Sequence, residues 1–221
     1  MKIPLFVEVI GEPAVGKTHF AAGFPRVFFI DTTPKAESFV VVRKVIGEEF
    51  EKRWVNCPSF EAVRKAVGEA VKREDVATVV IDTSSKLQEM AKAEWLRERK
   101  GRERPLPFEY VEIREKIDRL IEAVVSSGRN LVFTSVLKDE YDPSGRKTGR
   151  RIRDGYVKTP YMVDLMLKIV LEDRGNEVVR RCLVLKNRFR DRAGKEWIGE
   201  IEPNWSGVVK VTGLGAEEVV V

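Results

Sequence analysis

The sequence predicts a single α/β domain, with a mostly parallel central sheet flanked by helices and an antiparallel β extension toward the C-terminus. Between residues 3 and 136, short apolar runs alternate with segments of helical period, which is typical of strands joined by crossover helices. A glycine-rich loop follows the first apolar run directly, and the runs beyond residue 160 are strand-like. We expect a core over about residues 3–173, a β-hairpin extension over about 176–213 and a short C-terminal tail.

Four apolar runs predict the strands of the core sheet, over residues 3–10, 27–30, 76–81 and 131–136. Amphipathic spacing predicts the helices between them, over about residues 17–24, 60–73, 84–99 and 113–125. The turn-forming residues Asp31, Thr32, Thr33 and Pro34 follow the second strand.

The second half of the chain has a different pattern. Residues 138–160 show little apolar periodicity and predict a long charged loop or a ribbon. Strands are then expected over residues 163–171, 178–185, 196–201 and 208–212, the last three antiparallel. We therefore expect a β-rich C-terminal portion.

Composition excludes several classes of protein. Of the 221 residues, 43% are hydrophobic and 34% charged, and no apolar run approaches the roughly 20 residues that cross a bilayer. Lys2 precedes an apolar run, but Glu8 interrupts it, so we expect a cytoplasmic protein without a signal peptide or a membrane partner. Cys57 and Cys182 lack metal-like spacing and predict reduced core thiols without a disulfide, and a single histidine, His19, disfavours a histidine-ligated metal.

The loop after the first strand carries the chemistry. Residues 11–18 read GEPAVGKT, which matches the P-loop motif G-x-x-x-x-G-K-T. Its glycines let the backbone curl so that N–H groups point at phosphate oxygens, while the lysine reaches the outer phosphates and the threonine hydroxyl binds Mg²⁺. The predicted ligands are ATP and Mg²⁺, and the predicted nucleotide-binding residues are Gly11, Glu12, Pro13, Ala14, Val15, Gly16, Lys17, Thr18 and His19.

A P-loop needs an acidic partner at the tip of a neighbouring strand. The run VATVVID ends in Asp82, which we predict to act with Thr18 on Mg²⁺. Asp82 also precedes a helix, so a helix N-cap is the alternative role for its carboxylate.

Together these segments resemble a known family. The order of the P-loop, FFID, VVIDTSS and LVFTS is similar to that of RecA-like P-loop ATPases, which include recombinases and hexameric helicases. In size the chain is most similar to the small phage and archaeal RecA-like single-strand annealing ATPases, which are AAA-type nucleotide-binding proteins. The resemblance covers about residues 3–202 and implies an ATPase that assembles into a homo-oligomeric ring or filament.

The chain departs from that family at two places. The water-activating glutamate expected after the second strand is replaced by Thr33, whose hydroxyl is not ionised at neutral pH. Asp31 or Glu37 could take its place, or hydrolysis could be slow. The sensor glutamine expected after the fourth strand is also missing, since Thr134 and Ser135 stand there. Nucleotide binding is therefore better supported than fast turnover.

A late segment, VLKNRF, resembles the K-x-R hairpin of hexameric helicases. That resemblance implies that Lys186 and Arg188 reach the γ-phosphate held by a neighbouring subunit, with Arg188 as an arginine finger. A solvated edge strand with basic residues is the alternative. Asp164, at the start of the strand before it, is expected to link the preceding loop to the core.

Basic residues also fill the segment that follows the fourth strand, where RecA-like proteins hold DNA. The cations expected on single-stranded DNA are Lys138, Arg146, Lys147, Arg150, Arg151, Arg153 and Lys158. Tyr141 and Tyr156 lie among them and could stack on unpaired bases. The alternative is a basic hairpin that only solvates the surface.

The leading hypothesis is an ATP-dependent protein that binds single-stranded DNA in recombination, annealing or repair. A small-molecule kinase with RERKGRER (97–104) or GRKTGRR (145–151) as an arginine-rich lid is one alternative. A nucleotide-dependent assembly switch without DNA is another. The tryptophans Trp54, Trp95, Trp197 and Trp205 are expected to pack in the core.

Overall fold

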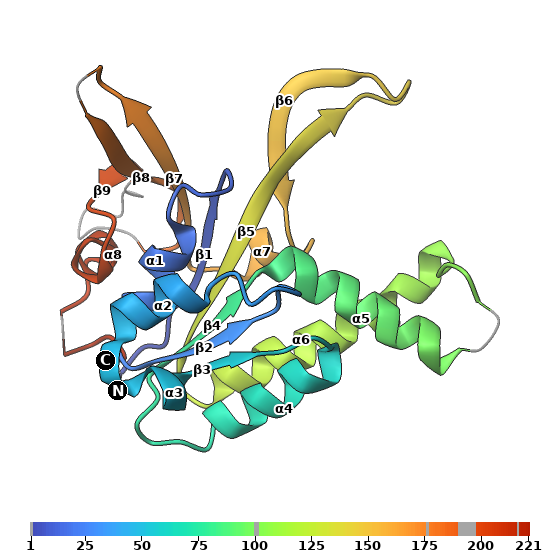
Figure 1. Ribbon diagram of the computed structural model, residues 1–221, viewed down its shortest axis with the longest axis horizontal. Coiled ribbons are helices and arrows are strands. Elements are labelled where there is room, and N and C mark those ends of the chain that lie inside the picture. The colour runs from blue at the N-terminus through green and yellow to red at the C-terminus, as the bar shows by residue number, and fades with distance from the viewer. Residues whose placement is uncertain (1, 100–101, 176, 190–197, 216) are drawn as a thin grey trace.

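The computed structural model describes residues 2–99, 102–175, 177–189, 198–215 and 217–221 (Figure 1). Its strands in these ranges form one sheet. They are β1 (Phe6–Gly11), β2 (Val27–Asp31), β3 (Trp54–Asn56), β4 (Thr78–Asp82), β5 (Asn130–Tyr141), β6 (Lys147–Asp154), β7 (Leu165–Asp173), β8 (Val178–Asn187) and β9 (Glu200–Ile201).

Helices connect most of the parallel strands. They are α1 (Lys17–Ala22), α2 (Phe39–Ile46), α3 (Phe50–Arg53), α4 (Phe60–Ala70), α5 (Ser84–Glu98), α6 (Tyr110–Ser126), α7 (Thr159–Met162) and α8 (Trp205–Thr212). Two short 3₁₀ turns, Gly47–Glu49 and Pro107–Glu109, precede α3 and α6. In the described ranges, no helix is both long and apolar enough to cross a bilayer.

The strand order confirms the predicted fold class. The sheet runs β3-β2-β4-β5-β1-β7-β8-β9, with β6 paired to β5 alone. The pairs from β3 to β7 are parallel, whereas β6, β8 and β9 pair antiparallel to their neighbours. The register sets Asp31 beside Asp82 and Asp82 beside Thr134. The ends of β2, β4 and β5 therefore meet at the edge where the loop after β1 begins.

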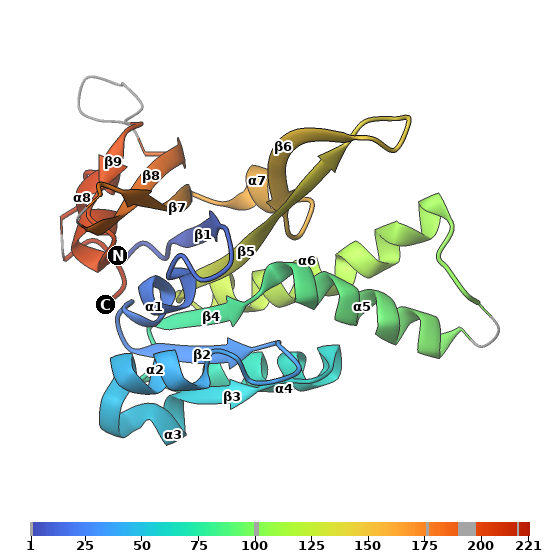
Figure 2. The same cartoon turned by 45° about the horizontal axis from the view of Figure 1, so that its top comes forward.

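Two apolar layers cover the two faces of the sheet (Figure 2). On one face, α4, α5 and α6 pack with Phe6 and Phe133. On the other, α1, α2 and α8 pack with Val7 and Val9. Strand β1 alternates between the layers because successive side chains of a strand point to opposite faces. Cys57 lies in the first layer and Cys182 in the second, both buried and unpaired.

The structure corrects several sequence-based assignments. Residues 208–212 were expected to form a strand but belong to helix α8, capped by the Asn204 side chain. The valines in this segment favour a strand, but Val208 and Val211 lie three residues apart and share the buried face of a helix. The expected strand over 196–201 is confirmed only at Glu200–Ile201: residues 196 and 197 lie outside the described ranges, and residues 198 and 199 are not part of a strand. Residues 39–56 received no assignment and contain α2, α3 and β3.

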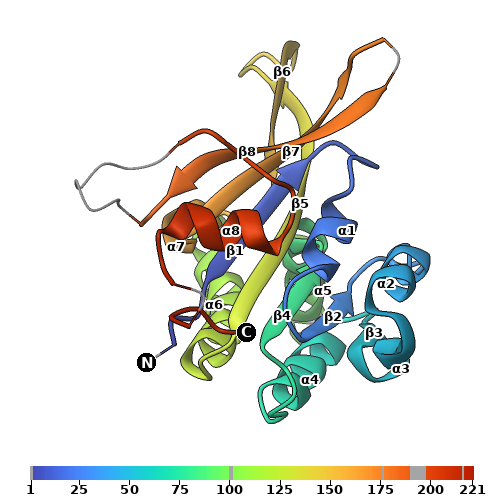
Figure 3. The same ribbon diagram turned by 90° about the vertical axis from the view of Figure 1, so that its left-hand side faces the viewer.

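Residues 138–160 form a ribbon rather than a loop for much of their length. Strand β5 continues beyond the sheet to Tyr141 and pairs with β6, and we call β5 beyond Val136 together with β6 the β5–β6 ribbon. A second ribbon, the β7–β8 hairpin, stands beside it. Figure 3 shows both rising from the end of the sheet where the loop after β1 lies.

Candidate functional site

The P-loop, residues 11–18, lies between β1 and α1 in a tightly curled conformation. Ala14 and Gly16 both have positive φ, at 63° and 99°. Gly11 passes so close to β7 that a Cβ there would meet the Ile169 carbonyl oxygen at 2.6 Å. Left-handed residues in such a loop turn successive N–H groups toward one concavity, which suits an anion. The local structure thus requires the glycines that the motif supplies.

Lys17 and Thr18 begin α1 and face the ends of the strands. The Lys17 side chain is buried and its Nζ donates to the carbonyl oxygens of Gly11 at 3.0 Å and Glu12 at 2.6 Å. Burial lowers the pKa of Lys17, and the negative charges of Asp82 and Glu12 oppose that shift. Lys17 therefore lies folded against its own loop and has to turn outward to reach a phosphate.

Asp82 ends β4 beside the P-loop. Its Oδ2 accepts a hydrogen bond from Thr18 Oγ1 at 2.8 Å, and its Oδ1 accepts one from the Thr134 hydroxyl at the end of β5. Burial raises the pKa of Asp82, and these two hydroxyl donors partly offset that shift. Helix α5 is capped by the Thr83 side chain, so the alternative role of Asp82 as the N-cap does not apply.

This pair fits a magnesium site. Mg²⁺ is held in proteins by one or two carboxylates together with phosphate oxygens and waters, not by a full protein cage. Thr18 and Asp82 supply one hydroxyl and one carboxylate in contact with each other. The described ranges hold no cluster of three or more histidine, cysteine or acidic residues that could bind a metal ion.

The turn after β2 contains Asp31 and Glu37, the two proposed replacements for the water-activating glutamate that is missing at Thr33. Asp31 is fully buried, and its two oxygens accept four hydrogen bonds, from the backbone N–H and hydroxyl groups of Thr33 and Ser38. Its carboxylate is therefore committed to holding this turn. Glu37 is exposed, and its backbone N–H donates to the Thr33 hydroxyl at 3.0 Å. Of the two proposed replacements, Glu37 is the one whose carboxylate faces solvent.

Lys186 and Arg188 lie at the opposite end of the sheet from the P-loop of the same chain. Residues 186 and 187 pair with the start of β7, which itself pairs with the beginning of β1. Lys186 Nζ donates to the carbonyl oxygens of Pro160 and Val163, both at 2.8 Å. Arg188 forms an ion pair with Asp164 at 3.1 Å. The structure thus separates these two cations from Lys17 and Asp82 within one chain.

Asp164 also anchors β1, since its Oδ2 accepts from the backbone N–H of Phe6 at 2.8 Å. The segment before β7 is in this way joined to the core sheet, as expected for a linking role. Arg188 contacts the same segment through the carbonyl oxygens of Tyr161 and Met162.

The basic residues of the β5–β6 ribbon have two kinds of environment. Five of the seven expected DNA contacts form ion pairs within the chain: Lys138 with Asp154, Lys147 with Asp139, Arg151 with Glu12 and Asp139, Arg153 with Glu8, and Lys158 with Asp118. Arg146 and Arg150 are exposed and form no ion pair with any described residue. Tyr141, near the ribbon's tip, is 57% exposed.

Arg153 and Tyr156 turn inward at the base of the ribbon. Arg153 Nε contacts both carboxylate oxygens of the fully buried Glu8 at 2.7 Å. Tyr156 is also fully buried, and its hydroxyl donates to Asp118 at 2.7 Å. The prediction that Tyr156 stacks on bases is therefore wrong, because its ring packs in the core layer of α5 and α6. Sequence position placed Arg153 on the surface, but alternation along β6 points it at β1.

One contact joins the ribbon to the P-loop. Arg151 donates from Nε to Glu12 Oε1 at 3.0 Å and from Nη2 to Glu12 Oε2 at 2.6 Å. The same guanidinium pairs with Asp139 at 2.9 Å. Neither this contact nor the one between Thr134 and Asp82 was predicted, because both depend on strand register and not on a contiguous motif.

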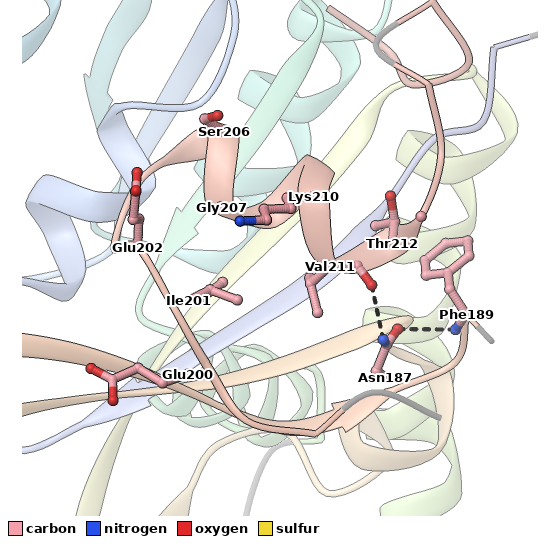
Figure 4. A pocket seen from close by; sticks show the side chains of 11 residues that line it. Asn187, Phe189, Glu200, Ile201, Glu202, Ser206, Gly207, Lys210, Val211 and Thr212 are labelled. Atoms are coloured by element: carbon pink, nitrogen blue, oxygen red, sulfur yellow. Dashed lines mark hydrogen bonds between the residues drawn. The ribbon is translucent and has the colours of Figure 1, made fainter. Parts of the chain in front are cut away.

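A cavity of about 450 Å³ lies elsewhere, between the end of β8 and α8 (Figure 4). Asn187 closes one side, where its Nδ2 donates to the Val211 carbonyl oxygen at 3.0 Å. The residues that line it include none of the P-loop. We do not assign it to the nucleotide.

Comparison with known proteins agrees with this geometry. The sequence model of a family described as AAA domain matches residues 4–194. The fold is similar to the crystal structure of a KaiC-like protein from the hyperthermophilic archaeon Pyrococcus horikoshii OT3, with a TM-score of 0.52 and 20% identity. That match covers 90% of this chain and 87% of the archaeal chain. No curated protein matches.

Proposed function

Since this chain belongs to the AAA domain family and carries a nucleotide-binding RecA-like ATPase fold, we propose that it binds ATP with Mg²⁺ and hydrolyses ATP slowly. The observation that carries the proposal is the contact between Thr18 Oγ1 and the Asp82 carboxylate beside a curled P-loop. A P-loop enzyme uses such a hydroxyl and carboxylate for Mg²⁺, and this supports the proposal.

Each residue has a defined task in this proposal. The backbone N–H groups of the P-loop hold the phosphates, and Lys17 turns from the Gly11 and Glu12 carbonyl oxygens to the outer phosphates. Thr18 and Asp82 would hold Mg²⁺, which when bound offsets the charge of the β- and γ-phosphates. Thr134 keeps the Asp82 carboxylate oriented through its hydroxyl.

Slow hydrolysis follows from the turn after β2. Thr33 cannot accept a proton from water at neutral pH, and the Asp31 oxygens are occupied by four hydrogen bonds. Glu37 carries the exposed carboxylate of this turn. Unless Glu37 approaches the nucleotide after binding, the site holds ATP without an efficient general base.

We further propose that the β5–β6 ribbon binds single-stranded DNA, in recombination, annealing or repair. Exposed Arg146 and Arg150 offer cations without internal partners among the described residues, and Tyr141 offers an exposed ring near them. The ribbon stands free of both helix layers (Figure 1).

The protein acts as a homo-oligomer in this proposal, with Lys186 and Arg188 reaching a neighbour's nucleotide. Support comes from their position at the end of the sheet opposite the chain's own P-loop, which excludes a role in the same subunit. Arg188 is half-exposed and would exchange its Asp164 partner for a phosphate. A planar guanidinium pairs well with two phosphate oxygens.

One set of measurements tests these proposals. ATP affinity, ATPase rate and oligomeric state are compared with and without single-stranded DNA in the wild type, Lys17→Ala and Arg146→Ala/Arg150→Ala. We expect Lys17→Ala to weaken ATP binding at least about tenfold, since it removes a charge-assisted contact. The ribbon variant should lose DNA affinity and reduce the slope of log K against log salt by about 1 to 2.

The matched control for the ribbon is Arg64→Ala/Lys72→Ala, which removes two exposed cations from the opposite side of the molecule, on and after α4 (Figure 1). Equal loss of DNA binding in both double variants would contradict a ribbon site. A monomer that binds no DNA at low salt would contradict the DNA role, and phosphoryl transfer to a nucleotide or small molecule would identify a kinase instead. If Arg188 acts across subunits, mixing Arg188→Ala with Lys17→Ala protein restores part of the activity.

A further inference from the structure

The β7–β8 hairpin brings one arginine onto the P-loop of the same chain. Residue 180 of β8 pairs with Leu171 of β7, just beyond the point where Ile169 touches Gly11. From there Arg180 Nε donates to the Val15 carbonyl oxygen at 2.9 Å. A Cβ on Gly16 would lie 2.6, 2.7 and 2.8 Å from Nε, Cζ and Nη2 of Arg180. The guanidinium therefore lies flat against residues 15 and 16 of the loop.

Arg180 shares a side of β8 with residues of the core layer around the P-loop. Cys182 and Val184, two and four residues further along the strand, belong to the same apolar layer as Val15 and Phe20. The alternation of β8 thus directs residue 180 toward the P-loop and its helix. The side-chain alternation of β8 therefore sets the contact between Arg180 and the P-loop, and the contact does not depend on the conformation of the side chain alone.

The charge of Arg180 is not paired with any acidic residue that the structure describes. In the part of the chain that the structure describes, Arg180 makes the hydrogen bond to Val15 and no ion pair. Its neighbour Arg181 points to the other side of the strand and pairs with Glu172 at 3.0 Å and Glu200 at 2.6 Å. Arg181 is thus neutralised within the chain, whereas Arg180 is exposed on β8 and no described residue is bonded to its Nη1 or Nη2.

We propose that Arg180 is a further phosphate-binding residue of the nucleotide site, supplied by β8 of the same subunit. The N–H groups of the P-loop converge on a site for an anion. Arg180 lies beside these groups without an ion pair to a described residue, so an anion bound there would balance its charge. A guanidinium bonded through Nε still presents its terminal nitrogens to phosphate oxygens. Unlike Lys17, whose Nζ is occupied by two carbonyl oxygens, Arg180 has donors available before nucleotide arrives.

This inference rests on the proposed binding of ATP, and it assigns the site a second cation from the same chain. Arg180 differs in this from Arg188, which lies just beyond the far end of β8 and would act on a neighbour's nucleotide. A brace that only holds Val15 is the competing role for Arg180. The two roles differ in their dependence on charge, since a brace needs a donor to the carbonyl oxygen and a phosphate contact needs a cation.

The test compares Arg180→Ala, Arg180→Lys and Arg180→Gln, with Arg181→Ala as the matched control; glutamine keeps an N–H donor without the charge. Dissociation constants are measured for a fluorescent ATP analogue and, by competition, for inorganic tripolyphosphate, at two or more salt concentrations. We expect Arg180→Ala and Arg180→Gln to weaken the binding of both ligands by about 10- to 100-fold, as for loss of a charge-assisted hydrogen bond. Arg180→Lys should recover most of the affinity, and Arg181→Ala should stay within about twofold of the wild type.

Equal affinities in the lysine and glutamine variants, whether both are kept or both are lost, or unchanged affinity in all three, would overturn the proposal. Thermal melting of the unliganded proteins checks that the variants fold, which we expect because residue 180 is exposed. If the wild type and Arg181→Ala bind ATP but the Arg180 variants bind equally well, this inference fails alone. If the wild type does not bind ATP, the proposed function fails with it.

Discussion

The P-loop end of the sheet and the β5–β6 ribbon are neighbours that use charged side chains in different ways. At the P-loop, Lys17, Asp82 and Arg180 converge on one small region, and two of the three are buried. On the ribbon, most cations face an acidic residue of the same chain, as Lys147 does with Asp139. The first region concentrates charge for a ligand, and the second balances most of its charge internally.

The comparison shows which sequence patterns predict where side chains lie in the folded protein. A P-loop is contiguous, so its residues come together wherever the loop is placed. A basic run has no such constraint, because each residue's direction depends on strand alternation and on what the neighbouring strand carries. Only Arg146 and Arg150 of the seven expected DNA contacts are free of internal ion pairs among the described residues.

The largest expected effect is at Arg153. If Arg153 behaved as an exposed cation, the ribbon would not balance its charge internally and the contrast with the P-loop would not hold. We expect Arg153→Ala to lower the free energy of unfolding by about 3 to 5 kcal/mol at pH 7, because it leaves the buried Glu8 carboxylate without a charged partner and with only the Ser135 hydroxyl as a side-chain donor. Lys138→Ala, which removes an exposed ion pair from the same ribbon, should cost about 1 kcal/mol or less. Chemical denaturation of both variants measures the difference.

The pH dependence identifies the cause. Burial raises the pKa of Glu8 above its ordinary value of 4.5, and Arg153 partly offsets the rise. A carboxyl with a raised pKa in the folded state makes the protein less stable as pH rises from below 4.5 through that raised pKa. Removing Arg153 raises the pKa further, so the variant's deficit should grow with pH. In a Glu8→Gln background this growth should disappear; if it persists, another group is responsible.

The fold was largely predictable because its core strands are apolar runs separated by helices of clear period. All four expected strands of the core are present, at Phe6–Gly11, Val27–Asp31, Thr78–Asp82 and Asn130–Tyr141. Helix α8 was missed because a short segment rich in valine has high strand propensity, and burial against the sheet overrides propensity.

For the candidate site, the contiguous part was predictable and the long-range part was not. Gly11–Thr18 and Asp82 could be assigned from a motif and from the end of a strand. The contacts of Thr134 with Asp82 and of Arg180 with Val15 depend on which strands are neighbours and in what register. Sequence spacing carries no direct signal for either, since 52 and 165 residues separate the partners.

Tyr156 gives a smaller effect that sharpens the boundary between the ribbon and the core. Tyr156→Phe removes the hydrogen bond to Asp118 but keeps the buried ring, so we expect a loss of about 1 kcal/mol in the free energy of unfolding. Affinity for single-stranded DNA should not change. Tyr141→Ala, at the exposed end, is the contrasting variant and should weaken DNA binding by removing a stacking surface. If Tyr156→Phe lowered DNA affinity as much as Tyr141→Ala, the ribbon's base would belong to the binding surface.

The smallest effect is expected at Glu12, the P-loop residue that contacts the ribbon. Glu12→Gln removes one carboxylate from the Arg151 guanidinium, which stays paired with Asp139. Exposed ion pairs contribute up to about 1 kcal/mol, so we expect DNA affinity at low salt to rise about fivefold at most. Glu140→Gln removes the same charge from the ribbon at a residue bonded to Thr148 and not to the P-loop. If ATP alters DNA affinity in the wild type and in Glu140→Gln but not in Glu12→Gln, the ion pair between Glu12 and Arg151 couples the P-loop to the ribbon. If ATP changes DNA affinity equally in the two variants, the P-loop and the ribbon influence each other only through the electrostatic field of their charges.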